Sequence, residues 1–212
     1  MRKSHSNGAD TYRAIRAAAV DLIYRYGYNG TSMRRLAAEV GIDQSTLYYH
    51  IKSKQNLLYQ INTDVRDQYL ADLHEALSVD DPVDQLRRFI RYHVGFRFKL
   101  RKMSFIAASE LRFLAQAKRK KVIDTQRVVL DSIKDIIDAG ITAQVFDVPD
   151  STVAALAIIQ LLNGINSWYS PSGRLSEEQV IEMNTQFVLG LLRSGKLEER
   201  ASRPIDADGS LN

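Results

Sequence analysis

Between residues 44 and 51 the chain holds polar and aromatic side chains with only two apolar anchors. Leu47 and Ile51 are four residues apart, so a helix places them on one face and turns the others away from it. Amide, hydroxyl, phenol and imidazole groups can bond base edges or phosphates in a major groove. We therefore predict a helix that reads nucleic acid through Gln44, Ser45, Thr46, Tyr48, Tyr49 and His50. Taken alone, Tyr49 is equally compatible with a small helical core.

The residues before this run predict a first helix and a tight turn. Ser32 is a suitable N-cap, and apolar residues then recur at helical spacing from Met33 to Val40. Gly41 stands where a helix ends in a left-handed residue, and Asp43 or Gln44 can cap the second helix. The side chains expected to hold the two helices together are Met33, Leu36, Val40, Ile42, Leu47 and Ile51.

The run from Thr31 through Leu57 resembles the DNA-binding motif of the TetR family of one-component repressors. The similarity lies in the segments Leu36-Ala37, Val40-Gly41-Ile42, Thr46-Leu47-Tyr48 and Lys52-Ser53-Lys54. Ile51 stands where the family usually carries Phe, which should alter packing and not recognition. The resemblance implies that Thr46 and Tyr48 contact DNA and that Lys54 meets a phosphate, with Gln44, Ser45, Tyr49 and His50 as neighbours.

Composition and charge narrow the class of protein. Among 212 residues there is no cysteine, which excludes disulfides, thiolate metal sites and a cysteine nucleophile. No stretch approaches the roughly 18 apolar residues that span a bilayer, so we expect a soluble cytoplasmic protein. Residues 1–60 hold nine Lys and Arg against four Asp and Glu, whereas the remainder holds 20 against 21. The positive excess lies with the predicted DNA-reading segment.

The spacing of apolar residues predicts helices throughout and no strand. We expect a first helix from Asp10 or Thr11 to about Gly27, and a long helix capped by Ser53 that runs to Ser78. Pro82 opens the next helix, which runs to about Leu100. The fold class is therefore all-α, an N-terminal three-helix helix-turn-helix domain followed by a C-terminal helical ligand-binding and dimerisation domain.

Cap residues predict the boundaries of the later helices. Ser104 is expected to cap a helix, and Gly140 is expected to end the following one as a C-terminal cap. Asp150 or Ser151 starts a strongly apolar helix, and Ser176 with Gln179 forms a capping box for the last one. The expected division is a flexible tail at 1–10, the DNA-binding domain at 11–58, the ligand-binding and dimerisation domain at 59–196 and a disordered tail at 197–212.

Two surface features allow more than one interpretation. The basic run Lys118 to Lys121 is more typical of a solvated helix face than of a nucleic-acid site. Small residues in the last two helices, Ala154, Ala155 and Gly164, favour a subunit interface. The family resemblance implies that these two helices form a four-helix bundle with the same pair from a second copy, giving a homodimer.

Nothing in the sequence predicts catalysis. The four histidines are scattered, and no HExxH, Walker A or glycine-rich phosphate loop occurs, so we expect no enzyme, metal site or cofactor. We predict instead a transcriptional repressor that binds a near-palindromic double-stranded DNA operator as a dimer and is released by a small hydrophobic effector. Activation in place of repression, and an architectural DNA-binding protein or dimeric adaptor without ligand control, are the alternatives.

The C-terminal helices contain apolar and cationic residues suited to a hydrophobic carboxylate or thioester. The candidate ligand contacts are Tyr92, Phe96, Arg97, Arg101, Phe105, Arg112, Asn166 and Trp168. Core packing is the more usual role for most of these aromatic residues. The segments FDVPD and NGINSWYSPSGRLSEEQV resemble the branch of the family that regulates fatty-acid, branched-chain and sterol breakdown, which implies an acyl-CoA effector.

Overall fold

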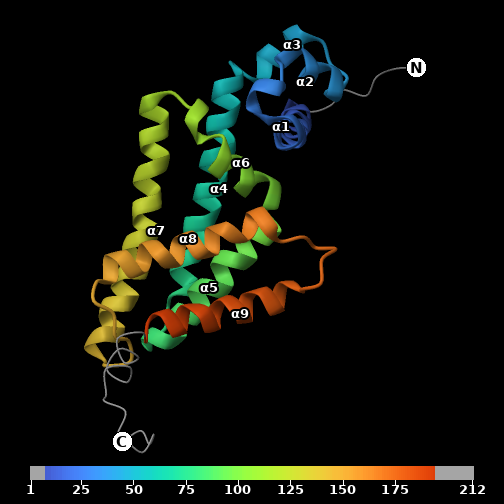
Figure 1. Ribbon diagram of the computed structural model, residues 1–212. Coiled ribbons are helices and arrows are strands. Elements are labelled where there is room, and N and C mark those ends of the chain that lie inside the picture. Colours follow the sequence, from blue (N-terminus) through green and yellow to red (C-terminus); the bar gives the residue numbers. More distant parts are fainter. Residues whose placement is uncertain (1–7, 194–212) are drawn as a thin grey trace, which may run out of the picture. The chain divides into compact units, whose positions relative to one another are not determined.

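The computed structural model describes residues 8–193, which form helices and no strand (Figure 1). The helices of the first half are α1 (Gly8–Gly30), α2 (Met33–Val40), α3 (Gln44–His50), α4 (Lys54–Ala76) and α5 (Pro82–Lys99). They are followed by α6 (Arg101–Ser109), the short 3-10 helix η1 (Leu111–Phe113), α7 (Gln116–Thr142), α8 (Ser151–Trp168) and α9 (Glu177–Leu191). The all-α prediction is confirmed for this part of the chain.

The chain divides into two compact units that are each discontinuous in sequence. The first unit consists of Met1–Ala71 and Lys99–Thr125, and the second consists of Asp72–Phe98 and Gln126–Asn212. The prediction placed a single boundary after residue 58. In the structure the chain returns to the first unit at residues 99–125. The first unit carries 18 Lys and Arg against 8 Asp and Glu, the second 11 against 17. The charge separation is therefore stronger than a division at residue 60 indicates.

Local capping interactions explain the helix-turn-helix. The Ser32 side chain accepts a hydrogen bond from the Arg35 backbone N–H at 3.1 Å, as predicted for the N-cap of α2. Gly41 ends α2 with a φ of 74°, a left-handed conformation that favours glycine. Asp43 caps α3. Of the six side chains predicted to hold the two helices together, Leu36, Leu47 and Ile51 are buried in one hydrophobic cluster with residues of α1 and α4. The other three, Met33, Val40 and Ile42, are partly buried and pack against this cluster.

The prediction that Ser104 caps a helix is wrong. Helix α6 begins at Arg101, so Ser104 lies inside it, and its buried hydroxyl has no hydrogen-bond partner among the described residues. The chain turns instead at Leu100, whose φ and ψ of −113° and 36° separate α5 from α6. Leucine carries no turn signal, so the boundary could not be found from residue type.

The prediction that Gly140 ends its helix is also wrong, because α7 continues to Thr142. The glycine is needed for packing: a Cβ at this position would lie 1.9 Å from a ring carbon of Phe146. The ring is 3% exposed and closes over the helix, while the amides of Val145 and Phe146 both donate to the Gly140 carbonyl. The left-handed residue after α7 is Gln144, with a φ of 59°.

Of the two predicted tails, only residues 8–10 lie in the part of the chain that the structure describes. Helix α1 already begins at Gly8, so residues 8–10 are helical where a flexible tail was predicted. Residues 1–7 and 194–212, which hold most of the first predicted tail and all of the second, lie outside the described part.

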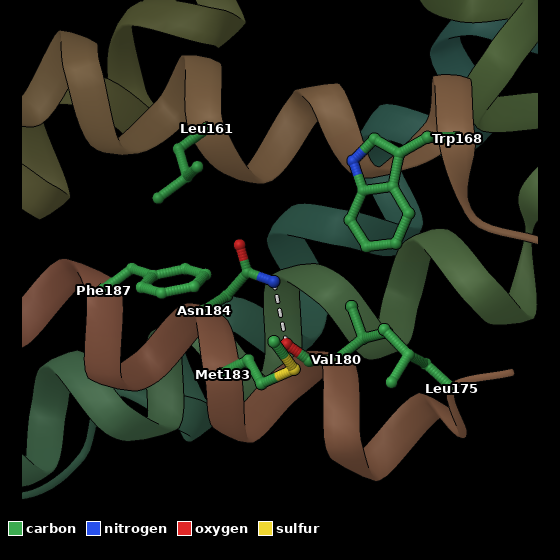
Figure 2. Close-up of a pocket in the computed structure, with 7 residues that line it drawn as sticks. All are labelled: Leu161, Trp168, Leu175, Val180, Met183, Asn184 and Phe187. Carbon is green, nitrogen blue, oxygen red and sulfur yellow. Dashed lines mark hydrogen bonds between the residues drawn. The ribbon is translucent and has the colours of Figure 1, made fainter.

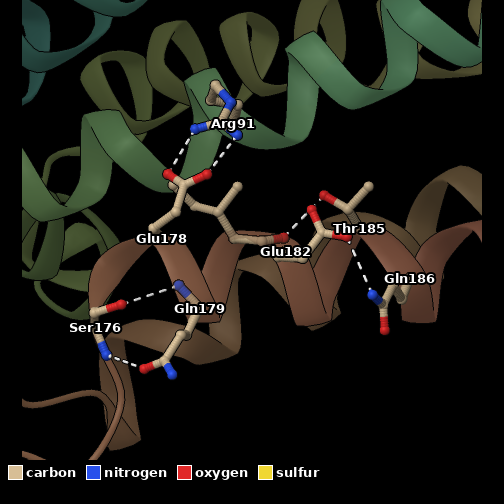
Figure 3. A network of polar contacts seen from close by, with 8 residues as sticks. Arg91, Ser176, Glu178, Gln179, Glu182, Thr185 and Gln186 are labelled. Atoms are coloured by element: carbon tan, nitrogen blue, oxygen red, sulfur yellow. Dashed lines mark hydrogen bonds and ion pairs between the residues drawn. The ribbon is translucent and has the colours of Figure 1, made fainter.

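In the second unit, α8 and α9 run antiparallel to one another (Figure 1). The predicted capping box of Ser176 and Gln179 is present at the start of α9, with bonds of 3.2 and 2.9 Å (Figure 3). In the first turn of the same helix, Glu178 forms a two-pronged ion pair with Arg91 of α5, with both bonds 2.7 Å long. These contacts fix the start of α9 within the second unit.

Candidate nucleic-acid interface

Helix α3 presents one buried residue to the core and a polar, aromatic surface to solvent. Leu47 is fully buried, whereas Tyr48 is 51% exposed and Tyr49 is 87% exposed. Gln44 and Ser45 are also exposed, and Thr46 and His50 are accessible at least in part. The exposure of Tyr49 rules out the alternative of a core role. Every α3 side chain predicted to contact DNA is thus at least partly accessible.

The Asp43 carboxylate organises the first turn of α3. It accepts hydrogen bonds from the Ser45 hydroxyl at 2.6 Å, the Thr46 backbone N–H at 2.7 Å and the Thr46 hydroxyl at 3.0 Å. The bond from Ser45 and the two from Thr46 lower the pKa of Asp43 to about 2, so the group is ionised at neutral pH and only accepts. The hydroxyl protons of Ser45 and Thr46 therefore point to Asp43, and their lone pairs remain for a ligand.

Lys54 has protein partners that the sequence did not reveal. Its ammonium donates to the backbone carbonyls of Tyr28 at 2.7 Å and Thr31 at 2.8 Å, and it lies 4.1 Å from the centre of the Tyr28 ring. Burial lowers the pKa of Lys54. An ammonium has three N–H donors, so one remains for a phosphate. Lys54 ties the start of α4 to the connection between α1 and α2.

A Lys54→Met substitution is expected to destabilise the protein as well as weaken DNA binding. The change removes two charge-assisted hydrogen bonds, and losses of this kind cost about 1.5 to 3 kcal/mol each. Urea unfolding followed by circular dichroism measures the effect. Lys52→Met is the matched control, because Lys52 is exposed and its loss should change the free energy of unfolding by less than about 0.5 kcal/mol. Equal unfolding midpoints for the two variants would show that the carbonyl contacts of Lys54 contribute nothing.

The aromatic neighbours of Lys54 were also missed. The Tyr28 ring stacks on Phe113 of η1 with centroids 4.9 Å apart, and the Gln55 side chain donates to the Phe113 carbonyl at 3.3 Å. Two aromatic residues 85 positions apart offer no local pattern that predicts this contact.

The eight candidate ligand contacts are divided between the units. Arg101, Phe105 and Arg112 belong to the first unit, whereas Tyr92, Phe96, Arg97, Asn166 and Trp168 belong to the second. Phe105 packs edge-on against Tyr24 at 5.3 Å, and the Arg112 guanidinium lies 5.0 Å from the Phe113 ring centre. Phe105 and Arg112 thus have packing roles within the first unit.

In the second unit, Arg97 is part of a polar network with His93 and Asn163. Arg97 was predicted as a ligand contact, whereas these two partners were not. Its Nε donates to His93 Nε2 at 2.9 Å, and its terminal nitrogen donates to the Asn163 side-chain oxygen. His93 is 3% exposed, and burial together with the Arg97 charge lowers its pKa to about 3. The imidazole is therefore neutral at physiological pH. The network holds a guanidinium, a donor for anionic groups, in a fixed orientation.

Trp168 lines an apolar groove between α8 and α9 (Figure 2). The groove has a volume of about 240 Å³ and is lined by Leu161, Trp168, Leu175, Val180, Met183, Asn184 and Phe187. Trp168 is 54% exposed and Phe187 57%. Ala154 and Ala155, expected to favour an interface, are buried within the unit's own core, whereas a Cβ at Gly164 would meet no atom within 4 Å.

Among the helices of the described part, none combines the length and the apolarity needed to cross a membrane.

Two family profiles match the chain: "Bacterial regulatory proteins, tetR family" over residues 15–61 and "Tetracyclin repressor-like, C-terminal domain" over residues 79–192. The chain belongs to the TetR family. The fold and the family are those of DNA-binding regulators and not of enzymes.

Similar proteins include other TetR-family regulators. The HTH-type transcriptional regulator RutR of Escherichia coli is 28% identical over 79 residues, which cover 37% of each chain. The crystal structure of PfmR from Thermus thermophilus is 27% identical with a TM-score of 0.77, covering 82% of this chain and 96% of PfmR. AibR, solved in complex with isovaleryl coenzyme A and operator DNA, is 27% identical with a TM-score of 0.76, covering 86% of this chain and 97% of AibR. The chain spans little more than a third of the length of RutR, so the activity of that whole protein is not transferred to it.

Proposed function

We propose that this TetR-family protein is a ligand-responsive repressor that binds a near-palindromic operator as a homodimer. The observation that carries the proposal is the surface of α3, where Leu47 alone is fully buried and the polar and aromatic side chains are accessible. Such a surface suits insertion into a major groove. Acting on chromosomal DNA, the protein functions in the cytoplasm.

The Asp43 network indicates how α3 reads bases. Because the hydroxyl protons of Ser45 and Thr46 are held by Asp43, these two oxygens present only acceptors. Acceptors in the major groove pair with the amino groups of adenine and cytosine and not with phosphate oxygens. Phosphate oxygens need N–H or O–H donors, and these are available on Tyr48, Tyr49, His50 and Lys54. The Gln44 amide can donate or accept, so it can serve either role.

The dimer forms through α8 and α9. Large apolar residues are exposed on both helices: Val153, Leu156, Leu161, Trp168, Met183 and Phe187. Exposed apolar patches of this kind mark interaction sites in folded proteins. Gly164 lies between Leu161 and Trp168 on α8 and leaves room for a partner helix. Trp168 therefore belongs to the interface in this proposal, in place of its expected ligand contact.

The effector is a small anion with an apolar tail, and an acyl-CoA thioester fits this description. Arg97, oriented by His93 and Asn163, provides a fixed cation within the second unit. Tyr92 and Phe96 pack against each other on the same helix, with ring centroids 6.0 Å apart. AibR, of similar fold, was crystallised with isovaleryl coenzyme A and operator DNA. A guanidinium and two aromatic side chains on the same helix support this effector class.

Release requires a conformational difference between the free and bound protein. Helix α4 carries residues of both units, so a shift at its second-unit end is transmitted along a continuous helix to Lys54. Two recognition helices must lie about 34 to 36 Å apart to enter successive major grooves. A differential affinity of about 3 to 5 kcal/mol between conformations empties most operators.

The test begins with selection of an operator from a random duplex library by the full chain. We expect the selected duplex to bind about 10³-fold or more tightly than random DNA at the same salt concentration. Acyl-CoAs of graded chain length are then titrated into the complex, and at least one should release the DNA. If the affinities for the selected operator and for random DNA are nearly equal, the repressor proposal is contradicted and an architectural DNA-binding protein is favoured. Tight, specific binding that no acyl-CoA affects contradicts the effector class alone.

A further inference from the structure

We propose that a basic surface at the start of α7, formed by Arg119, Lys120 and Lys121, is a second DNA-binding surface that contacts duplex flanking the operator. The inference rests on the proposed function, since it adds phosphate contacts to an operator complex. In sequence this run is typical of a solvated helix face. Its surroundings in the first unit change that interpretation.

Contacts within the first unit fix the start of α7 beside the first turns of α4. The Lys118 ammonium donates to the Asn56 side-chain oxygen at 3.2 Å and lies 5.1 Å from the centre of the Tyr59 ring. Asn56 follows Lys54 by two residues, so its side chain leaves the first turn of α4 on a different face, about half a turn around the helix. Lys54 is the predicted phosphate contact, so the start of α7 lies beside the turn of α4 that carries this contact but on another face, which favours flanking duplex over the operator itself.

The basic surface belongs to a segment with a large excess of positive charge. The segment Lys99–Thr125 contains eight Lys and Arg against two Asp and Glu. Within the surface, Lys120 lies 3.8 Å from Asp124 in a highly exposed pair of the kind that contributes little to stability. Cations near the start of a helix gain nothing from its dipole, so helix stability does not explain the cluster.

DNA is the occupant that fits this position. Duplex DNA carries one negative charge per roughly 1.7 Å of axis, and it continues beyond each half-site that α3 reads. Arg119, Lys120 and Lys121 are exposed on the unit that carries α3, and in this proposal a duplex seated on α3 reaches them where it continues beyond the half-site. Each phosphate that a Lys or Arg neutralises steepens the salt dependence of binding by about 0.9 on a log–log plot.

The experiment compares the wild type with the triple variant Arg119→Gln, Lys120→Gln and Lys121→Gln. Binding is measured by fluorescence anisotropy over a range of salt concentrations, on the selected operator alone and on the operator extended by about one and a half helical turns at each end. On the extended duplex, we expect the triple variant to reduce the slope by about 2 to 3 per subunit. On the operator alone, we expect no change.

The matched control removes three exposed cations from the second unit through Arg87→Gln, Arg88→Gln and Arg127→Gln. It should leave both slopes unchanged. The proposal is overturned by an unchanged slope on the extended duplex, by equal losses on both duplexes, or by the same loss in the control. If the wild type fails to distinguish operator from random DNA, the repressor proposal fails. The slopes on short and long random duplexes then still test the basic surface.

Discussion

Replacing Phe187 with arginine is expected to separate the dimer into monomers and to reduce operator affinity by about 100-fold or more. Phe187 is 57% exposed on α9 and lines the apolar groove with Trp168 and Met183. In a symmetric dimer, the substitution places two unpaired charges in an apolar interface, where each is costly to desolvate. Loss of the second recognition helix removes an avidity of about 10² to 10⁴.

Sedimentation velocity measures the oligomeric state, and anisotropy measures the operator affinity of the same samples. Val128→Arg is the matched control, because Val128 is 50% exposed on α7 of the same unit but does not line the groove. It should remain a dimer with normal affinity. A Phe187→Arg protein that stays dimeric and binds operator normally would place the interface elsewhere.

Substitutions in α3 should separate base reading from phosphate binding. Thr46→Val keeps the branched shape and leaves the backbone bond from residue 46 to Asp43 in place, but removes the hydroxyl acceptor. We expect a loss of about 1 to 3 kcal/mol at one adenine or cytosine position, with relaxed specificity there. Tyr48→Phe removes a phosphate donor and should weaken binding to all sequences by a similar amount.

Selection from a randomised operator library, followed by affinity measurements on single-base variants, distinguishes these results. Tyr26→Phe is the control for loss of a phenolic hydroxyl, since Tyr26 is 47% exposed in the first unit but lies on α1. It should bind like the wild type. If Thr46→Val weakens every sequence alike, its hydroxyl contacts phosphate, and the assignment of Asp43 as the residue that orients it is wrong.

Short-range interactions made much of the helix-turn-helix predictable. The caps at Ser32 and Asp43 and the left-handed Gly41 depend on hydrogen bonds and backbone angles within a few residues. The exposure of α3 also follows from spacing, because a helix with two apolar positions four apart can bury only one face. The capping box at Ser176 is local in the same sense.

Predictions failed where a distant residue determined the structure. Gly140 has the residue type of a helix end, but Phe146 needs the space that a side chain would fill. Ser104 has the residue type of an N-cap, yet the chain turns at Leu100 and buries it. Residue type reports local preference, and tertiary packing overrides a preference worth about 1 kcal/mol.

The sequence by itself determined that this is an all-helical TetR-family protein and which side chains of α3 face outward. Only the tertiary structure decided that residues 99–125 return to the first unit, and that Lys54 is held by the carbonyls of Tyr28 and Thr31. The physical reason is the sequence separation between the residues that interact. Caps and helical spacing act within one or two turns, whereas the contacts of Lys54, Phe113 and Lys118 join segments 23 to 85 residues apart.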